Sequence, residues 1–186
     1  MSQDTSIQTY SGILFDVINP TKEMVNITDI AHALSQVNRF TGHTMLPYSV
    51  AEHSVHVANL LPDEYKLEGL LHDASEAYIA DMATPVKQLT GMFNYRLIEN
   101  DIQNVCYDTF GIKTTEFSHC AIKHYDRVML KVEALSLMKQ PLLGAWVPLI
   151  ESIHLPVHPI PRCWSSIYAE ERFLNLFDRL YKNVVR

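Results

Sequence analysis

The segment that organises this chain spans residues 70–81 and reads LLHDASEAYIAD. Apolar residues in and around it recur at the spacing of an amphipathic helix, which predicts a helix through the whole segment. Glu76 follows His72 by four residues and Asp73 by three, so these side chains can lean toward one point above the helix. The apolar positions are Leu67, Leu70, Leu71, Ala74 and Tyr78.

Ionisable side chains on such a face need a partner, because burying them alone is costly. A metal ion would serve, since neutral imidazole and carboxylate form a normal coordination shell for a divalent ion that keeps positions open for water. Taken alone, an adjacent His-Asp pair is more often an ordinary surface or helix-end pair. The metal hypothesis therefore depends on further ligands elsewhere in the chain.

Composition narrows the class of protein. The chain has 186 residues, 47% of them hydrophobic and 19% charged, which is ordinary for one globular domain. A formal charge of −6 argues against a nucleic-acid polymer as partner, although a small phosphate-bearing ligand is compatible with a local basic pocket. The three widely spaced cysteines form no CxxC site, and the sequence shows neither a membrane span nor a secretion signal. We expect a cytoplasmic protein of a bacterial or phage-infected host cell.

The periodicity predicts an all-α fold in a single domain, residues 1–186, with a short extended segment at residues 9–17. Thr28 is the expected N-cap of the first helix, which should stop near residues 38–40. Pro62 opens a central helix that continues to about residue 80. Further helices are expected at residues 49–61, 94–109, 118–139 and 164–183, with a Pro-rich loop at residues 141–163.

Two more candidate ligands lie on these helices. Ser49 to Glu52 forms a capping box, and His53 follows it in the first turns of the same helix. Asp126 lies four residues after Ile122 on the buried stripe of the long helix, where an Asp needs a partner. His56 is ambiguous, and an ordinary core or surface role is favoured for it.

Two loops could hold a phosphate. Arg39 lies among small and polar residues at 39–44, where it either binds a phosphate through two hydrogen bonds or is a solvated charge at a helix end. The segment 81–87 carries Asp81, Thr84 and Lys87 directly after the central helix and could close over a phosphate. The alternative is that Thr84 and the following proline only mark a helix start.

In order along the chain, His53, His72-Asp73 and Asp126 resemble the HD-domain metal phosphohydrolase superfamily. Residues 39–44, 48–54, 72–78 and 81–87 resemble the YfdR/YfbR-like nucleotidase group, which includes bacterial 5′-deoxynucleotidases and the phage DatZ-type dATP triphosphohydrolases. The resemblance covers roughly residues 8 to 140. It departs from the group at Ala80, where the family often has Gly, and at Phe40, where the adenine-specific phage enzymes can carry a bulkier aromatic residue.

The resemblance implies an HD-type helical bundle and a role for each matching residue. The metal ligands would be His53, His72, Asp73 and Asp126, binding Co²⁺, Mn²⁺, Zn²⁺ or Mg²⁺. Glu76 would be the catalytic carboxylate, and Asp81, the second catalytic residue, would support the substrate pocket. The substrate phosphate would contact Arg39, Thr84 and Lys87, and the remaining pocket residues would be Phe40 and His43.

We therefore expect a metal-dependent hydrolase that cleaves the P–O5′ bond of a small deoxynucleotide, first of all dATP, giving deoxynucleoside and triphosphate. The alternatives are a 5′-deoxynucleotidase acting on monophosphates, a cyclic-dinucleotide phosphodiesterase and a nucleotide-sensing module without turnover. A triphosphate needs further cations, for which Lys66, Lys113, Lys123, Lys131 and Arg162 are available. We expect a homo-oligomer, because the apolar C-terminal helix is compatible with subunit packing, and no membrane partner.

Overall fold

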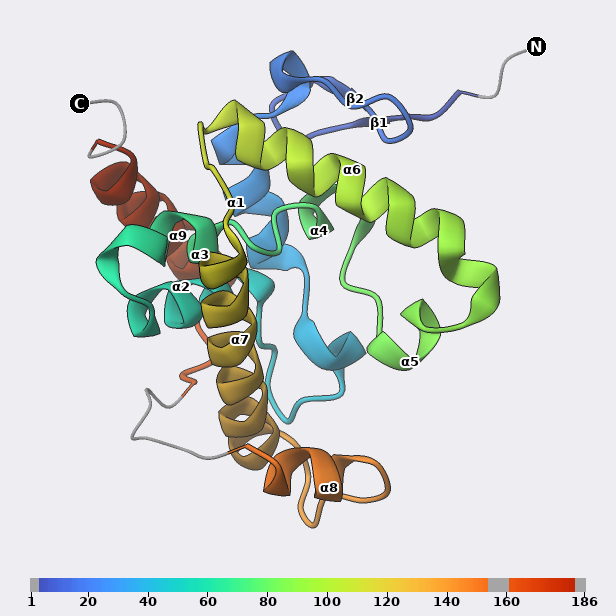
Figure 1. The fold of residues 1–186 in the computed structure, drawn as a ribbon, viewed down its shortest axis with the longest axis vertical. Helices are drawn as coiled ribbons and strands as arrows, with labels where there is room; N and C mark the ends of the chain where they lie inside the picture. The colour runs from blue at the N-terminus through green and yellow to red at the C-terminus, as the bar shows by residue number, and fades with distance from the viewer. Residues whose placement is uncertain (1–3, 154–160, 183–186) are drawn as a thin grey trace.

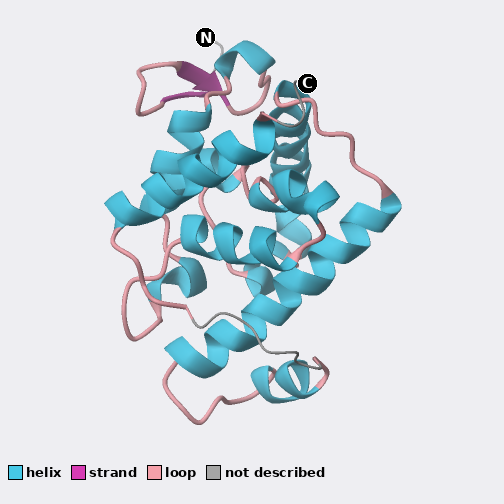
Figure 2. Ribbon diagram, turned by 90° about the vertical axis from the view of Figure 1, so that its left-hand side faces the viewer, coloured by secondary structure: helices cyan, strands magenta, loops and turns pink. Residues whose placement is uncertain are grey.

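The computed structural model describes residues 4–153 and 161–182 of the chain and shows a bundle of helices with one small hairpin (Figure 1). The prediction of an all-α helical bundle is confirmed. Helices also make up most of the molecule in the view turned by 90°, and the strands lie at one end (Figure 2). Among the described residues, no helix is both long and apolar enough to cross a membrane.

The N-terminal hairpin differs from the single extended segment expected at residues 9–17. Two strands, β1 (Ser6–Gln8) and β2 (Leu14–Asp16), pair antiparallel with Ile7 opposite Phe15. Residues 9–13 form the turn, and Gly12 adopts the left-handed conformation that glycine tolerates best. Phe15 is fully buried and its ring stacks on Tyr78 with 3.7 Å between centroids, so the hairpin lies against the core beside the central segment.

The helices surround one main core. α1 (Ile27–Gln36), α2 (Val50–Leu60), α3 (Lys66–Leu70) and α9 (Ser166–Tyr181) pack together around it, and α7 (Glu116–Leu137) packs on the outer side of α2. A second cluster, in which Val57 and Leu61 meet Ile122 and Met129, joins α2 to α7. The remaining helical elements are η1 (Lys22–Met24), η2 (Arg39–Gly42), η3 (Asp63–Tyr65), α4 (Glu76–Ile79), α5 (Thr84–Lys87), η4 (Thr90–Met92), α6 (Phe93–Thr109) and α8 (Trp146–Glu151).

The central segment is not one helix, and the prediction of a continuous helix from Pro62 to residue 80 is wrong. α3 ends at Leu70 and α4 begins at Glu76, with a turn at residues 71–75 between them. Gln103 of α6 stabilises this turn by donating a hydrogen bond to the Leu71 carbonyl (2.7 Å) and accepting one from Ser75 N–H (3.0 Å). The Gln103 side chain thus pairs with the Leu71 carbonyl and the Ser75 N–H, two backbone groups that would bond to each other in a continuous helix. His72 and Asp73 lie in this turn.

Most other helix boundaries agree with those predicted from the sequence, but a few predictions need correction. The N-cap of α1 is Asn26, whose side chain accepts from Thr28 N–H at 2.8 Å, and not Thr28 itself. Ser49 caps α2 by accepting from Glu52 N–H, as expected. The Pro-rich segment 141–163 contains α8 and is not only a loop, while residues 154–160 of it and Asn183 of the expected C-terminal helix lie outside the described residues.

Candidate metal centre and substrate pocket

Three of the predicted ligands meet at the start of the turn after α3. His53 from α2 and His72 and Asp73 from the turn each offer one ligand atom, and these atoms all lie within 4.8 Å of one another. Asp73 Oδ2 is 3.3 Å from His72 Nε2 and 3.8 Å from His53 Nε2. A cluster of this size and chemistry can hold a divalent metal ion.

Asp126, the fourth predicted ligand, lies beside this cluster on α7. Its Oδ1 atom is 3.2 Å from His53 Nε2, although Asp126 is not a member of the three-residue cluster. Burial alone would raise the pKa of Asp126, but His53 and the other nearby positive groups hold that pKa well below its ordinary value. The carboxylate is therefore ionised and able to bind a cation.

Hydrogen bonds at the far side of each ring decide which nitrogen faces the cluster. His72 Nδ1 donates to the Gly69 carbonyl at 2.8 Å, and His53 Nδ1 donates to Glu133 at 2.6 Å. Each Nε2 atom is buried, close to carboxylates, and without a hydrogen-bond partner among the described residues. Rings fixed through Nδ1 in this way are typical of metal-binding histidines, so the donor set fits a metal ion.

The charges around His53 support the same conclusion. Burial and the nearby Arg39 guanidinium lower the pKa of His53, but Glu133 and Asp126 outweigh them and raise it to about 9. The surroundings thus favour a positive charge at the imidazole. A proton or a metal ion at Nε2 can supply that charge, and the two compete for the same lone pair.

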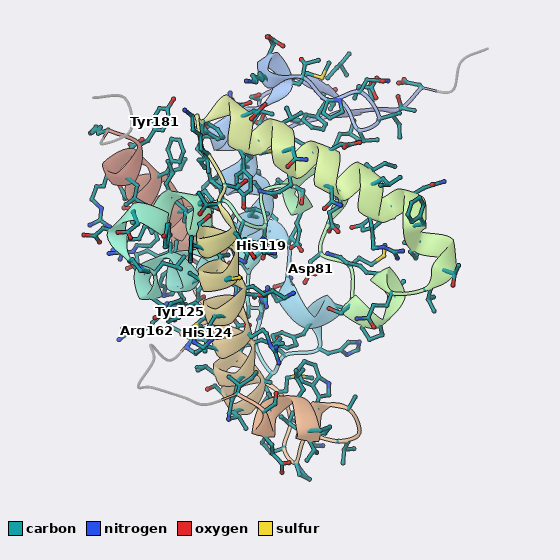
Figure 3. All side chains as sticks on the ribbon, in the orientation of Figure 1. Asp81, His119, His124, Tyr125, Arg162 and Tyr181 are labelled. Carbon is teal, nitrogen blue, oxygen red and sulfur yellow. The ribbon has the colours of Figure 1, made fainter. Side chains whose placement is uncertain are left out.

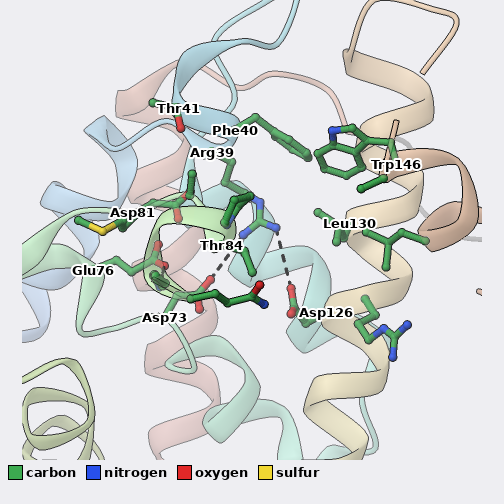
Figure 4. Close-up of a pocket in the computed structure, with 18 residues that line it drawn as sticks. Arg39, Phe40, Thr41, Asp73, Glu76, Asp81, Thr84, Asp126, Leu130 and Trp146 are labelled. Carbon is green, nitrogen blue, oxygen red and sulfur yellow. Dashed lines mark ion pairs between the residues drawn. The ribbon is translucent and has the colours of Figure 1, made fainter. Parts of the chain in front are cut away.

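Arg39 bridges Asp73 of the cluster and the neighbouring Asp126 (Figure 4). Its guanidinium nitrogens are 3.6 Å from Asp73 Oδ2 and 3.9 Å from Asp126 Oδ1, while Nε donates to Glu133 at 3.0 Å. Burial would lower the pKa of Arg39, but the three carboxylates outweigh it, and the side chain stays charged. Arg39 is therefore not the solvated helix-end charge of the alternative interpretation.

Glu133 is a residue of this site that the sequence interpretation missed. It is fully buried on α7, seven residues after Asp126 and therefore on the same face of the helix. Burial would raise the pKa of Glu133, but Arg39 and His53 lower it to about 2. A signal was present in the sequence, because Glu133 lies four residues after Met129 on the buried stripe where Asp126 had been noticed.

A cavity of about 540 Å³ opens above the cluster, within the size range of small-molecule sites. Eight of the predicted site residues line it: Arg39, Phe40, Asp73, Glu76, Asp81, Thr84, Lys87 and Asp126. Figure 4 shows acidic side chains on one side of this cavity and the aromatic rings of Phe40 and Trp146 on another. His43 is exposed and is not among the residues that line the cavity, so the structure places it outside the pocket.

Glu76 lies in an environment that disfavours its charge. The carboxylate is buried, and its Oε2 atom has no hydrogen-bond partner among the described residues. Burial raises the pKa of Glu76 well above its ordinary value, and the neighbouring Asp73 and Asp81 add to this effect. Lys87 opposes it only in part, because Lys87 Nζ is 3.7 Å from Glu76 but 2.6 Å from Glu99. A carboxylate with a raised pKa in a cleft is a candidate for proton transfer.

The aromatic side of the pocket is built from two distant segments. The rings of Phe40 in η2 and Trp146 in α8 are tilted by 36°, with 5.8 Å between centroids. Phe40 and Thr41 both have a positive φ, 56° and 53°, which costs non-glycine residues on the order of 1–3 kcal/mol each. Such strain is often found at ligand sites, and here it lies in the loop that turns Phe40 toward Trp146.

Other histidines lie away from the pocket. His56 contacts Glu52 at 3.4 Å and packs near Trp164, which agrees with the ordinary role favoured for it. His124 and Tyr125 project from the side of α7 away from Asp81 (Figure 3). Several residues that line the cavity were not predicted, among them Arg127, Leu130, Trp146 and Leu149.

Comparison with known proteins gives the family. No family model matches the chain. The uncharacterised protein YfdR of Escherichia coli K12 is 36% identical over 149 residues, which is 79% of each chain. The chain belongs to the YfdR family, a family of HD-domain proteins.

A second member comes from Rhodobacter capsulatus and is 36% identical over 135 residues, or 67% of this chain and 68% of the relative. It too is named as an uncharacterised protein, so neither of these YfdR relatives supplies a reaction. The reaction must be argued from the site.

Proposed function

We propose that this YfdR-family protein is a metal-dependent phosphohydrolase that cleaves the P–O5′ bond of a deoxynucleotide. The observation that carries the proposal is the pair of buried Nε2 atoms of His53 and His72, which face carboxylates and have no hydrogen-bond partner among the described residues. They lie beside a cavity whose described lining also includes three cationic side chains and two aromatic rings. Metal, phosphate and base would each find suitable side chains there.

The metal would be held by His53, His72, Asp73 and Asp126. When bound, a divalent ion supplies an activated water and polarises a phosphoryl oxygen. Glu76 would orient the attacking water and accept its proton, since it lines the same cavity and has a raised pKa. The water oxygen would bond to phosphorus while the P–O5′ bond breaks, and the departing O5′ would take up the proton that Glu76 has accepted from the water.

The chain's own cations would neutralise the phosphoryl group. Arg39 has two guanidinium nitrogens directed at the metal ligands, and Lys87 lies across the cavity beside Glu76. Thr84 lines the cavity at the start of α5 and offers a hydroxyl. Fixed positive groups of this kind stabilise the charge that develops on phosphorus oxygens.

Among deoxynucleotides we favour a dNTP, in particular dATP, with a dNMP as the alternative. Besides Arg39 and Lys87, the described lining of the cavity includes Arg127, which is exposed and whose one described hydrogen bond is to Ser152 Oγ at 3.4 Å. This side chain could reach the distal phosphates of a triphosphate. The five cations named earlier for that role, Lys66, Lys113, Lys123, Lys131 and Arg162, are not among the residues that line the cavity.

The cyclic-dinucleotide phosphodiesterase and the nucleotide sensor remain alternatives without a specific observation in their favour. The homo-oligomer is likewise still a prediction.

The proposed function is tested by substituting one metal ligand. Purified Asp73→Ala should lose its divalent metal by elemental analysis and lose turnover of every deoxynucleotide, while its circular dichroism spectrum stays that of the wild type. Turnover by a folded, metal-free Asp73→Ala protein would contradict the proposal.

A further inference from the structure

We infer that Glu133 is a positioning residue that fixes both the metal-binding face of His53 and the guanidinium of Arg39. The inference rests on the proposed metal site. Three donors converge on this one carboxylate, which is fully buried: His53 Nδ1 at 2.6 Å, the Tyr48 hydroxyl at 2.9 Å and Arg39 Nε at 3.0 Å.

The Oε1 atom of Glu133 determines which ring nitrogen of His53 keeps its proton when a metal ion binds. An ionised carboxylate only accepts hydrogen bonds, so both His53 Nδ1 and the Tyr48 hydroxyl must donate to Oε1. With the Nδ1 proton held there, Nε2 is the nitrogen left to exchange its proton for a metal ion, and it faces Asp73 and Asp126. A carboxylate behind the ring also makes the imidazole a stronger ligand.

The Oε2 atom of Glu133 determines the direction of Arg39. It binds Nε, which leaves the two terminal guanidinium nitrogens to face Asp73 and Asp126. Because the guanidinium is a rigid plane, holding Nε fixes where the other nitrogens lie. The same side chain therefore places the phosphate-binding cation directly over the metal ligands.

Two substitutions separate these effects. In Glu133→Gln the amide has one oxygen and one NH₂ group, and its oxygen is best placed toward the two donors His53 and Tyr48. The NH₂ group then faces Arg39 Nε, donor against donor, and Arg39 loses its anchor. In Glu133→Met both acceptors are gone, so the His53 proton is free to move to Nε2 and block the metal.

The experiment measures three quantities on purified protein: the Kd for Mn²⁺ by calorimetry, the Kd for inorganic phosphate, and, in metal-free protein above the His53 pKa of about 9, the tautomer of the neutral His53 ring by ¹⁵N NMR. We expect Glu133→Gln to bind Mn²⁺ within a few fold of the wild type but phosphate about 10-fold more weakly. Glu133→Met should bind Mn²⁺ about 10- to 100-fold more weakly, with the Nε2-protonated tautomer now present. Tyr48→Phe, which removes only the third donor, is the matched control and should leave all three readouts near the wild type.

If Glu133→Gln binds phosphate as tightly as the wild type, Glu133 does not position Arg39 and that half of the inference is overturned. If Glu133→Met keeps the wild-type Mn²⁺ affinity and His53 tautomer, Glu133 does not position His53 and the His53 part is overturned. If Glu133→Met does not fold, the His53 part is decided by the double variant Glu133→Gln/Tyr48→Phe, which should keep the wild-type tautomer and overturns this part if it does not. These readouts need no nucleotide turnover. A wild type that binds Mn²⁺ but hydrolyses nothing would end the proposed function and leave this inference standing.

Discussion

The aromatic wall of the pocket leads to a quantitative prediction about Trp146. If a nucleobase stacks on the aromatic wall formed by η2 and α8, the indole of Trp146 supplies one of its two surfaces, beside the ring of Phe40 at 5.8 Å. Replacing Trp146 by Ala removes that surface. The phosphate-binding and metal-binding side chains come from other elements and are not altered.

The expected size follows from the energy of stacking. One aromatic side chain contributes about 1–3 kcal/mol to binding a base, which corresponds to a factor of about 5 to 150 at room temperature. Trp146→Ala should therefore raise KM for a deoxynucleotide by about 5- to 150-fold with little change in kcat, because the lost contact is made in the ground state and the transition state alike. Trp146→Phe should recover most of the affinity.

The assay compares two substrates. A deoxynucleotide carries the base, and deoxyribose 5-phosphate carries the same P–O5′ bond without it. We expect Trp146→Ala to lower kcat/KM for the deoxynucleotide and to leave kcat/KM for deoxyribose 5-phosphate unchanged. If deoxyribose 5-phosphate loses as much kcat/KM as the deoxynucleotide does, then Trp146 supports the site in another way and the base-stacking argument is refuted.

Three further substitutions give predictions about the site and the core beside it. Glu76→Gln should keep its metal and lose about 10²- to 10⁴-fold in kcat, as expected for a proton-transfer group. Because the folded-state pKa of Glu76 is raised, its protonated form stabilises the fold at low pH and this stabilisation is lost as pH rises. The metal-free Glu76→Gln protein should thus melt higher than the metal-free wild type at pH 8, with the difference vanishing toward pH 4; equal Tm values at pH 8 would contradict this. Gly69→Ala would place a Cβ in collision with the flexible end of Leu61 and should cost about 1–3 kcal/mol in urea unfolding. Arg127→Ala should lower kcat/KM for dNTPs and not for dNMPs, and equal losses on both would remove Arg127 from phosphate binding.

The sequence allowed much of the fold to be predicted, because apolar periodicity survives even where the helix does not. Leu67, Leu70 and Leu71 are buried as a helix would bury them, yet the backbone turns at residues 71–75. The turn depends on Gln103, which lies about 30 positions along the chain. A contact between residues so far apart in the sequence cannot be predicted from the spacing of apolar residues in one segment.

Some residues of the site could likewise be predicted from the sequence, and others could not. His53, His72, Asp73 and Asp126 could be proposed because metal-binding residue types are unusual on apolar stripes, and the structure brings them together. Glu133 was missed because its role depends on three donors from two other segments. Trp146 was not assigned to the pocket because nothing in a Pro-rich stretch indicates that a short helix forms there and faces η2.

Product analysis tests the central claim most directly. The purified protein is incubated with each dNTP and each dNMP in the presence of Mn²⁺, Co²⁺ or Mg²⁺, with Asp73→Ala as the control, and the products are separated. The account predicts deoxynucleoside as a product, released with intact triphosphate from a dNTP, with dATP first, or with phosphate from a dNMP. Absence of deoxynucleoside from all substrates with all three metals would contradict it.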